Sequence, residues 1–294
     1  MDSEIDFDAV TKSFGDTKVF DDASFRLEPG LTFLVGRNGA GKSTLVRLAT
    51  GLERPNAGHV SIFGEPTHSI SLRTKRRFGV QLQNDAFVKG VRVREYVDLY
   101  EKMYALERNS PAPAWALDTQ RAVEMLGIAP LMRSYAYTMS GGQKKRVSLL
   151  LAIIGNKELI VLDEPTAGID ADVKESILRV IRLLREAGVN LLVSSHDLRE
   201  FFDIADNVVV VERGLRFSGS KLAFMERYGY THKVSVPYPL ADVQLQRLEH
   251  DDGIAYFGRS VAELSTYFSN ELIVPTTTVD LYQIATLRAE SENL

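Results

Sequence analysis

The 294-residue sequence contains no cysteine, which excludes disulfide scaffolds, thiolate metal sites and cysteine nucleophiles. It has only five histidines, and no two of them have the spacing of a metal-ligand pair. Basic residues are not in excess: 35 Lys and Arg stand against 39 Asp and Glu, so we expect no nucleic acid as the main partner. With 45% hydrophobic and 25% charged residues, the chain has the composition of a folded globular protein of one or two domains.

Long hydrophobic runs are also missing. The longest apolar stretches, such as 149–154 and 208–211, are far below the roughly 20 residues that cross a bilayer. The first ten residues, MDSEIDFDAV, are acidic, whereas a signal peptide needs a basic and then an apolar run. We therefore expect the protein to stay in the cytoplasm and any membrane role to come through a partner.

The first part of the sequence predicts a strand–loop–helix unit. Strands are expected over 5–10, 24–27 and 31–35, the last being a continuous apolar run bounded by glycines. A helix is expected from Lys42 to about Thr50, because Gly51 supplies a C-terminal stop.

The middle third of the sequence is predicted to be helical. Apolar positions recur at three and four residues over 94–108, 119–125 and 143–154, and the Pro-Ala-Pro stretch at 111–113 marks a loop. Strands then alternate with helices again, which is typical of a mostly parallel sheet with helices on its faces. The expected strands span 159–162, 191–194 and 208–212, and the expected helix spans 171–186.

The tail from about Thr231 onward has a different pattern and predicts a small appended α+β domain. It has no glycine-rich turn and no acidic pair at a strand end, so we expect an accessory role. The strand candidates are 234–236, 254–257 and 272–274, and the helical candidates are 240–248, 261–269 and 279–287.

The strongest chemical signal is the segment GRNGAGKS at 36–43, which matches the P-loop pattern G-x-x-x-x-G-K-[ST] between a predicted strand and a predicted helix. The glycines let backbone N–H groups curl around phosphates. Lys42 brings a positive charge to the β and γ oxygens, and the Ser43 hydroxyl can ligate Mg²⁺. The alternative is an ordinary glycine-rich turn with an exposed lysine.

Two further strand ends carry groups that suit phosphate chemistry. Asp163 and Glu164 follow the strand at 159–162, where Asp163 would hold a metal through water and Glu164 would polarise an attacking water. His196 follows the strand at 191–194 and could contact a γ-phosphate or orient Glu164. Taken alone, the acidic pair would be a solvated edge and the histidine structural; beside a P-loop the catalytic interpretation is favoured.

A second helix start is suited to anions. Ser140 can cap the helix, and Gly141 and Gly142 expose backbone N–H groups ahead of Gln143. Alone, this would be an ordinary helix start. One nucleotide needs only one P-loop, so a second phosphate-binding element suggests contact with a nucleotide held by another subunit.

Taken in order, GRNGAGKST, the LQ pair at 82–83, MSGGQKKR, LIVLDEPTAGID and SSHD resemble the motifs of ATP-binding cassette (ABC) ATPases over about residues 4–220. The resemblance implies an α/β P-loop NTPase fold with a RecA-like core, an antiparallel β subdomain and an α-helical signature subdomain at about 84–155. It also implies a nucleotide-binding domain over 1–230, followed by the accessory C-terminal α+β domain at 231–294.

The resemblance also implies roles for individual residues. Gln83 would be the Q-loop glutamine, catalytic together with Lys42, Glu164 and His196, and a metal ligand together with Ser43 and Asp163. Phe14 would stack on adenine, although it could instead be a core residue of the β subdomain. Residues 167–170 would form the D-loop that couples two sites. The nucleotide-binding set would be Phe14, Gly36, Arg37, Asn38, Gly39, Ala40, Gly41, Lys42, Ser43 and Thr44, with Ser140, Gly141, Gly142 and Gln143 reaching the ATP of the opposite protomer.

The function that the resemblance implies is that of an ATP-hydrolysing motor subunit, with ATP and Mg²⁺ as cofactors. Two copies, or one copy and a paralogous ATPase, would sandwich two ATP molecules and drive a separate integral membrane permease at the cytoplasmic face of the membrane. The segments 78–83 and 275–282 are similar to ATPases of ABC-2 type exporters of drugs, antibiotics, peptides or lipids.

Two alternatives stay open. One is a soluble ABC-type ATPase that acts on ribosomes or nucleic acid; such proteins usually carry two cassettes or long coiled-coil insertions, and this sequence has neither. The other is the ATPase of an importer, which a neighbouring gene for an extracytoplasmic binding protein would indicate.

Overall fold

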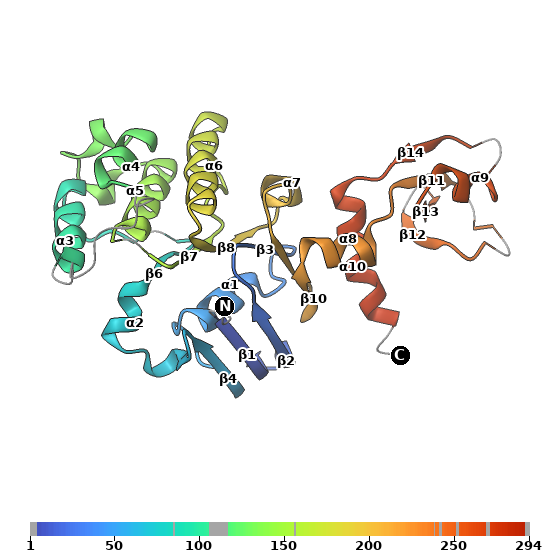
Figure 1. The fold of residues 1–294 in the computed structure, drawn as a ribbon, viewed down its shortest axis with the longest axis horizontal. Helices are drawn as coiled ribbons and strands as arrows, with labels where there is room; N and C mark the ends of the chain where they lie inside the picture. The colour runs from blue at the N-terminus through green and yellow to red at the C-terminus, as the bar shows by residue number, and fades with distance from the viewer. Residues whose placement is uncertain are drawn as a thin grey trace.

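The protein is described by a computed structural model that covers residues 5–84, 86–105, 117–155, 157–237, 239–240, 243–250, 253–268 and 271–291. Three β-sheets and their covering helices make up the described part of the chain (Figure 1). The predicted loop at 111–113 and the last residues of the helix predicted over 94–108 lie outside the described residues.

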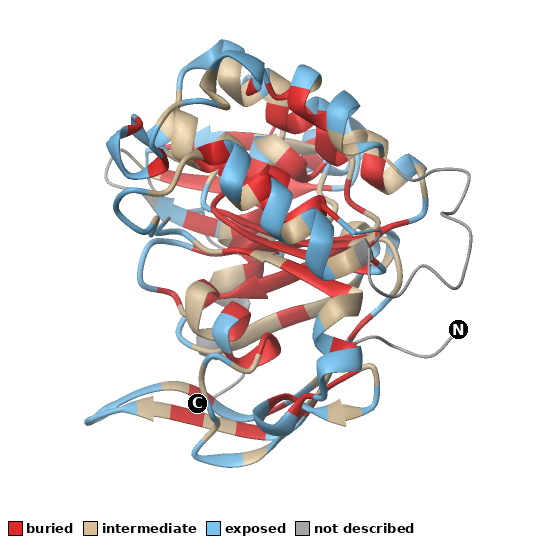
Figure 2. Cartoon of the chain, turned by 90° about the vertical axis from the view of Figure 1, so that its left-hand side faces the viewer, coloured by how far each residue is buried: buried red, intermediate tan, exposed pale blue. Residues whose placement is uncertain are grey.

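The central sheet has the strand order β10-β9-β3-β8-β7-β6. Its strands are parallel except for β10, which pairs antiparallel with β9. Strands β3, β7 and β9 are buried along their whole length, as expected of continuous apolar runs covered on both faces, and buried strands fill the centre of the molecule in Figure 2. The strands are β3 (Leu31–Val35), β6 (Phe78–Gln81), β7 (Leu159–Asp163), β8 (Asn190–Ser195), β9 (Asn207–Val211) and β10 (Leu215–Ser220).

An antiparallel sheet lies below the central sheet in Figure 1, in the order β2-β1-β4-β5. Helix α1 (Lys42–Ala49) and side chains of both sheets share one hydrophobic core, to which Phe7, Leu45 and Leu192 contribute. The strands are β1 (Ile5–Phe14), β2 (Thr17–Leu27), β4 (Ala57–Ile62) and β5 (Glu65–Pro66), and α2 (Leu72–Arg77) follows them.

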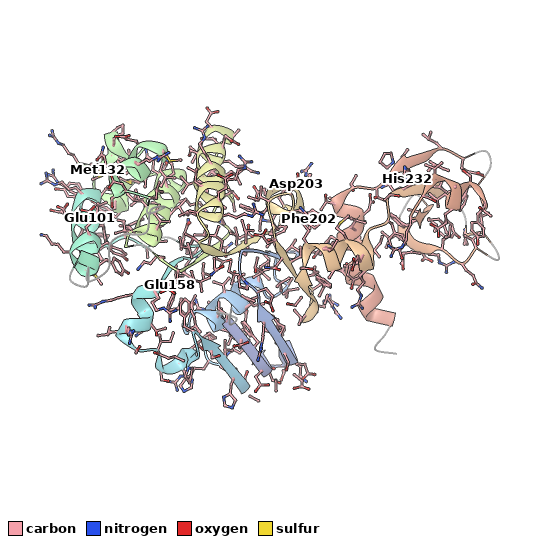
Figure 3. The ribbon with its side chains drawn as sticks, viewed as in Figure 1. Glu101, Met132, Glu158, Phe202, Asp203 and His232 are labelled. Carbon is pink, nitrogen blue, oxygen red and sulfur yellow. The ribbon has the colours of Figure 1, made fainter. Side chains whose placement is uncertain are left out.

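Helices cover the opposite face of the central sheet and form a second core with it. The predicted helices in this region are present as α3 (Val93–Ala105), α4 (Thr119–Met125), α5 (Gly141–Ile153) and α6 (Ala171–Glu186). Of the shorter helices, α7 (Leu198–Phe201) packs against β8, and α8 (Lys221–Tyr228) packs against β9 and β10. Phe202, labelled in Figure 3, stacks edge-on against Phe224 of α8, with ring centroids 5.7 Å apart.

The C-terminal region forms a third, antiparallel sheet in the order β12-β13-β11-β14, in which His232 of β11 is labelled in Figure 3. It has a small core of its own, which includes Val234, Tyr256 and Phe268. The region is α+β, as predicted. Its elements are β11 (His232–Val236), β12 (Gln246–His250), β13 (Gly253–Gly258), α9 (Val261–Ser265), β14 (Ile273–Pro275) and α10 (Thr278–Ser291).

Two features of this region differ from expectation. The helix predicted over 240–248 is wrong: none of its described residues is helical, and 246–248 belong to β12, which pairs with β13 and buries Leu248 between two exposed neighbours. The expected accessory domain is also not independent of the first domain, because its last helix packs against the region of the central sheet. Helix α10 contacts α7, α8, β9 and β10, and its residues Leu281 and Ile284 belong to the core of the central sheet.

Candidate nucleotide-binding and catalytic site

The P-loop connects the end of β3 to the start of α1 at the carboxyl edge of the central sheet. Gly39 and Gly41 have φ angles of 80° and 112°, which side chains rarely allow, and a Cβ on Gly41 would lie 2.7 Å from Val19 Cγ1. The first N–H groups of a helix have no intrahelical partner, so the start of α1 adds donors to those of the loop. Residues 36–44 therefore have the backbone form that the predicted phosphate cradle requires, and their binding role stays a prediction.

Lys42 is almost fully buried within this loop. Its Nζ donates hydrogen bonds to the carbonyl oxygens of Gly36 at 2.7 Å and Arg37 at 3.3 Å, and lies 3.2 Å from Glu164 Oε1. The ammonium group thus faces three oxygen acceptors. Phosphate oxygens would compete for the same donors, as the predicted role of Lys42 requires.

Asp163 and Glu164 occupy the buried carboxyl end of β7, next to the P-loop lysine. Ser194 Oγ donates to Asp163 Oδ1 at 2.5 Å and accepts the Glu164 N–H at 2.9 Å. His196 Nδ1 lies 2.8 Å from Glu164 Oε2, while Lys42 faces Oε1. The structure thus brings Lys42, Asp163, Glu164 and His196 together, although they come from three separate motifs.

Glu164 has a left-handed backbone conformation, with φ of 52°, which is unusual for a residue other than glycine. Such a conformation costs about 1–3 kcal/mol and persists only where its surroundings hold it. Here the N–H is held by Ser194, and the carbonyl oxygen accepts a hydrogen bond from Lys145 Nζ of α5. Gln81 of β6 donates to the Lys145 carbonyl at 3.3 Å, so α5 is hydrogen-bonded both to β6 and to the segment that follows β7.

Glu200 is a second connecting residue near the site, and it lies on α7 with its side chain buried. Its Oε2 accepts 2.8 Å hydrogen bonds from Thr166 and Ser195, and its Oε1 pairs with Lys174. It therefore joins the segment after Glu164 to the segment that precedes His196. No local sequence pattern distinguishes Lys145 or Glu200 from surface residues, so neither was among the predicted site residues.

The predicted signature residues form the capped start of α5. Ser140 Oγ accepts the Gln143 N–H at 3.4 Å, and Gln143 Oε1 accepts the Ser140 N–H at 3.1 Å. A hollow of about 390 Å³ opens here, and its described lining includes no P-loop residue. The lining residues come from the signature and from the predicted D-loop with the start of α6: Ser140, Gly141, Gly142, Gln143, Arg146, Gly168, Ile169, Asp170 and Val173.

Two predicted residues lie apart from the catalytic cluster. Gln83 is exposed, two residues beyond the end of β6, and no described hydrogen bond connects it to Asp163 or Glu164. Phe14, the last residue of β1, has 49% of its surface exposed, and Lys12 Nζ lies 4.8 Å from its ring centroid. This exposure excludes the alternative that Phe14 is a core residue, and it leaves a ring face open to a ligand.

Oxygen ligands for a metal ion are present at the site. The described residues contain no group of three His, Cys, Asp or Glu side chains that could hold a metal by themselves. The Ser43 hydroxyl and the Asp163 carboxylate are the hard oxygen donors that Mg²⁺ accepts together with substrate phosphates. The donor set therefore fits Mg²⁺ delivered with a nucleotide.

Comparisons with known proteins agree with this geometry. Residues 20–167 match the family model described as ABC transporter. The Nod factor export ATP-binding protein I of Rhizobium etli is 31% identical over 211 residues, which are 71% of this chain and 66% of that protein. The protein of the same name from Burkholderia thailandensis is 32% identical over 73% of this chain and 69% of its own length.

Solved structures show the same fold. The structure of an ATP-binding subunit of an ABC transporter aligns with a TM-score of 0.68 at 20% identity, over 77% of this chain and 94% of its own. The dimeric structure of a bacterial ABC transporter cassette aligns with a TM-score of 0.61 at 19% identity, over 74% and 98% of the two chains. Within the described ranges of the present chain, every helix is too short or too polar to span a bilayer.

Proposed function

Because the chain belongs to the ABC transporter family of ATPases, we propose that it is the motor subunit of an exporter and that two copies enclose two ATP molecules between them. The observation that carries this proposal is the contact of Glu164 with both Lys42 and His196. An ammonium group, a carboxylate and an imidazole thus lie around one point at the carboxyl edge of the sheet. That arrangement suits hydrolysis of a nucleotide γ-phosphate.

Each group would have a distinct role in that reaction. Glu164 would accept a proton from the attacking water, and His196, 2.8 Å away, would orient the carboxylate. Lys42 would exchange Glu164 and the loop carbonyls for phosphate oxygens. Ser43 and Asp163 would hold Mg²⁺, which supplies charge stabilisation to the phosphates; the exposed Gln83 would join this site only after its loop moves inward.

The hollow at residues 140–143 supports a composite site. It is lined by signature and D-loop residues but by none of the described P-loop residues, so the signature of one copy is free to face the nucleotide of another. Gly141 and Gly142 provide N–H groups there at the N-terminal end of a 13-residue helix. We propose a second copy, or a paralogous ATPase, as the partner.

Export through a separate membrane permease is supported by the names of the relatives, which are Nod factor export proteins. The peripheral location at the cytoplasmic face of the membrane follows from that partnership. Residues 231–294 would be the accessory region and about 84–155 the helical signature subdomain. The two alternatives, a soluble ATPase acting on ribosomes or nucleic acid and an importer ATPase, have no observation in the structure that favours them.

The variant Glu164→Gln tests the proposal. The amide cannot accept the proton, so hydrolysis should fall about 10²- to 10⁴-fold while ATP is still bound, and an ATP-dependent dimer should accumulate in light scattering. Adding Ser140→Arg should abolish that dimer, because the arginine would fill the position of the partner's phosphate.

The matched control is Glu158→Gln, at the other end of β7, where Glu158 pairs with Arg77 and is half exposed (Figure 3). It should hydrolyse ATP at the wild-type rate. Wild-type hydrolysis by Glu164→Gln, or an ATP-dependent dimer that survives Ser140→Arg, would contradict the proposed site.

A further inference from the structure

Helix α10 brings a tyrosine from the C-terminal region onto the P-loop. The Tyr282 hydroxyl accepts a hydrogen bond from the Arg37 N–H at 3.0 Å and donates one to Glu212 Oε2 at 2.9 Å. Arg37 is the second residue of the P-loop. Burial raises the pKa of Tyr282, and the hydrogen bond to Glu212 raises it further, so the phenol stays protonated and serves both as donor and as acceptor.

The start of the P-loop is pressed against the end of β9 on its other side. A Cβ on Gly36 would lie 2.3 Å from the Val211 carbonyl oxygen, so no side chain fits between the two segments. Glu212 directly follows β9, and its Oε2 also lies 3.5 Å from the Arg37 nitrogen. The Arg37 N–H therefore lies between Glu212, at the end of β9, and the Tyr282 hydroxyl.

Helix α10 is held both by the core of the central sheet and by the C-terminal sheet. Leu281, Ile284 and Ala285 are buried in the core of the central sheet. At the start of the helix, Asp280 accepts hydrogen bonds from the Thr277 N–H and, at 2.7 Å, from Lys233 of β11. A displacement of the C-terminal sheet would pull on Asp280, which is two residues from Tyr282.

We propose that Tyr282 is a positioning residue of the nucleotide site: it fixes the first turn of the P-loop, and through it the C-terminal region sets the affinity of the site for ATP. This inference rests on the proposed function, because it assumes that residues 36–44 bind nucleotide. It gives the C-terminal region a direct part in nucleotide binding. Tyr282 bonds to the loop and to Glu212 but has no described hydrogen bond to Lys42 or Glu164, so its loss should change the binding of ATP and leave the chemical step in place.

The test compares Tyr282→Phe with Tyr256→Phe. Both substitutions remove only a hydroxyl from a buried tyrosine of the C-terminal region, and Tyr256 also accepts a backbone N–H, that of Leu240, at 3.0 Å. Tyr256 lies on β13 of the third sheet. Tyr256→Phe therefore removes the same kind of group as Tyr282→Phe but affects no contact with the P-loop. The measurements are the dissociation constant for MgATP by calorimetry and the KM and kcat of hydrolysis.

We expect Tyr282→Phe to raise the dissociation constant and KM about 2- to 13-fold, the effect of one backbone hydrogen bond, with kcat within twofold of wild type. Amide hydrogen exchange over 36–44 should increase without nucleotide. Tyr256→Phe should leave the dissociation constant, KM, kcat and the amide hydrogen exchange over 36–44 unchanged. Equal KM values in wild type and Tyr282→Phe, or equal increases in both variants, would overturn the inference; failure of the wild type to bind MgATP would instead overturn the proposed function.

Discussion

Lys157 is a buried lysine far from the nucleotide site, and the pH dependence of the free energy of unfolding tests how much its burial destabilises the fold. It lies two residues before β7, at the end of the strand opposite to Asp163, and only 1% of its surface is exposed. Its Nζ donates to the Arg76 carbonyl at 2.9 Å and lies 3.2 Å from the centre of the Tyr104 ring. No carboxylate among the described residues pairs with it.

Burial, and to a smaller extent repulsion from Arg76, together lower the pKa of Lys157 from 10.5 to about 7. Between these two pH values the unfolded chain carries a proton that the folded chain has lost. The free energy of unfolding therefore rises with pH by about 1.4 kcal/mol per pH unit across that window. Below pH 7 the destabilisation is fully present and amounts to roughly 5 kcal/mol.

The variant Lys157→Met keeps a long side chain of similar volume and removes the charge. It should be more stable than wild type near pH 7, and its advantage should shrink as pH rises to 10. Urea unfolding at several pH values, without nucleotide, measures the difference in the free energy of unfolding between the two proteins. The titration of all other groups cancels in this difference.

The control is Lys75→Met on α2, which removes the same charge from an exposed position. Its stability difference from wild type should not vary with pH in this window. A difference between Lys157→Met and wild type that stays constant from pH 7 to 10, or that grows with pH, would refute the assignment of a buried, largely neutral lysine.

Two predictions concern the nucleotide itself. Lys42→Ala should weaken MgATP binding about 13- to 160-fold, because a hydrogen bond to a charged group contributes about 1.5–3 kcal/mol; wild-type affinity in calorimetry would contradict the P-loop assignment. Phe14→Ala should weaken ATP binding about 5- to 160-fold through lost base stacking but leave inorganic triphosphate binding unchanged, and equal effects on both ligands would show that Phe14 does not contact adenine.

Local patterns in the sequence were sufficient for most of the elements. The apolar run at 31–35 and the amphipathic period of 171–186 coincide with β3 and α6 to the residue, because side-chain periodicity alone decides such segments. The catalytic cluster was also predictable, since parallel strands end at one edge of a sheet and so place Glu164 and His196 close to the P-loop.

Contacts between distant segments were not predictable in the same way. Lys145 reaches the Glu164 carbonyl because α5 packs beside β6. Glu200 accepts hydrogen bonds from Thr166 and Ser195, which come close to it only in the folded chain. Apolar spacing predicts a helix over 240–248, but residues 246–250 form a strand because they pair with β13. These residues lack a short-range signature, since their partners lie on other elements.

The contact between Arg37 and Tyr282 also constrains how the protein is made. The two residues are 245 positions apart. At about 5–20 residues per second, a ribosome needs roughly 12 to 50 s to synthesise the chain between them. For that interval the P-loop exists without the helix, and the apolar surface on α7, α8, β9 and β10 that α10 later covers is open from the time those elements are made. The newly made central sheet must therefore persist with this surface open to water or to a chaperone, and the P-loop gains its contact with Tyr282 only after α10 has left the ribosome.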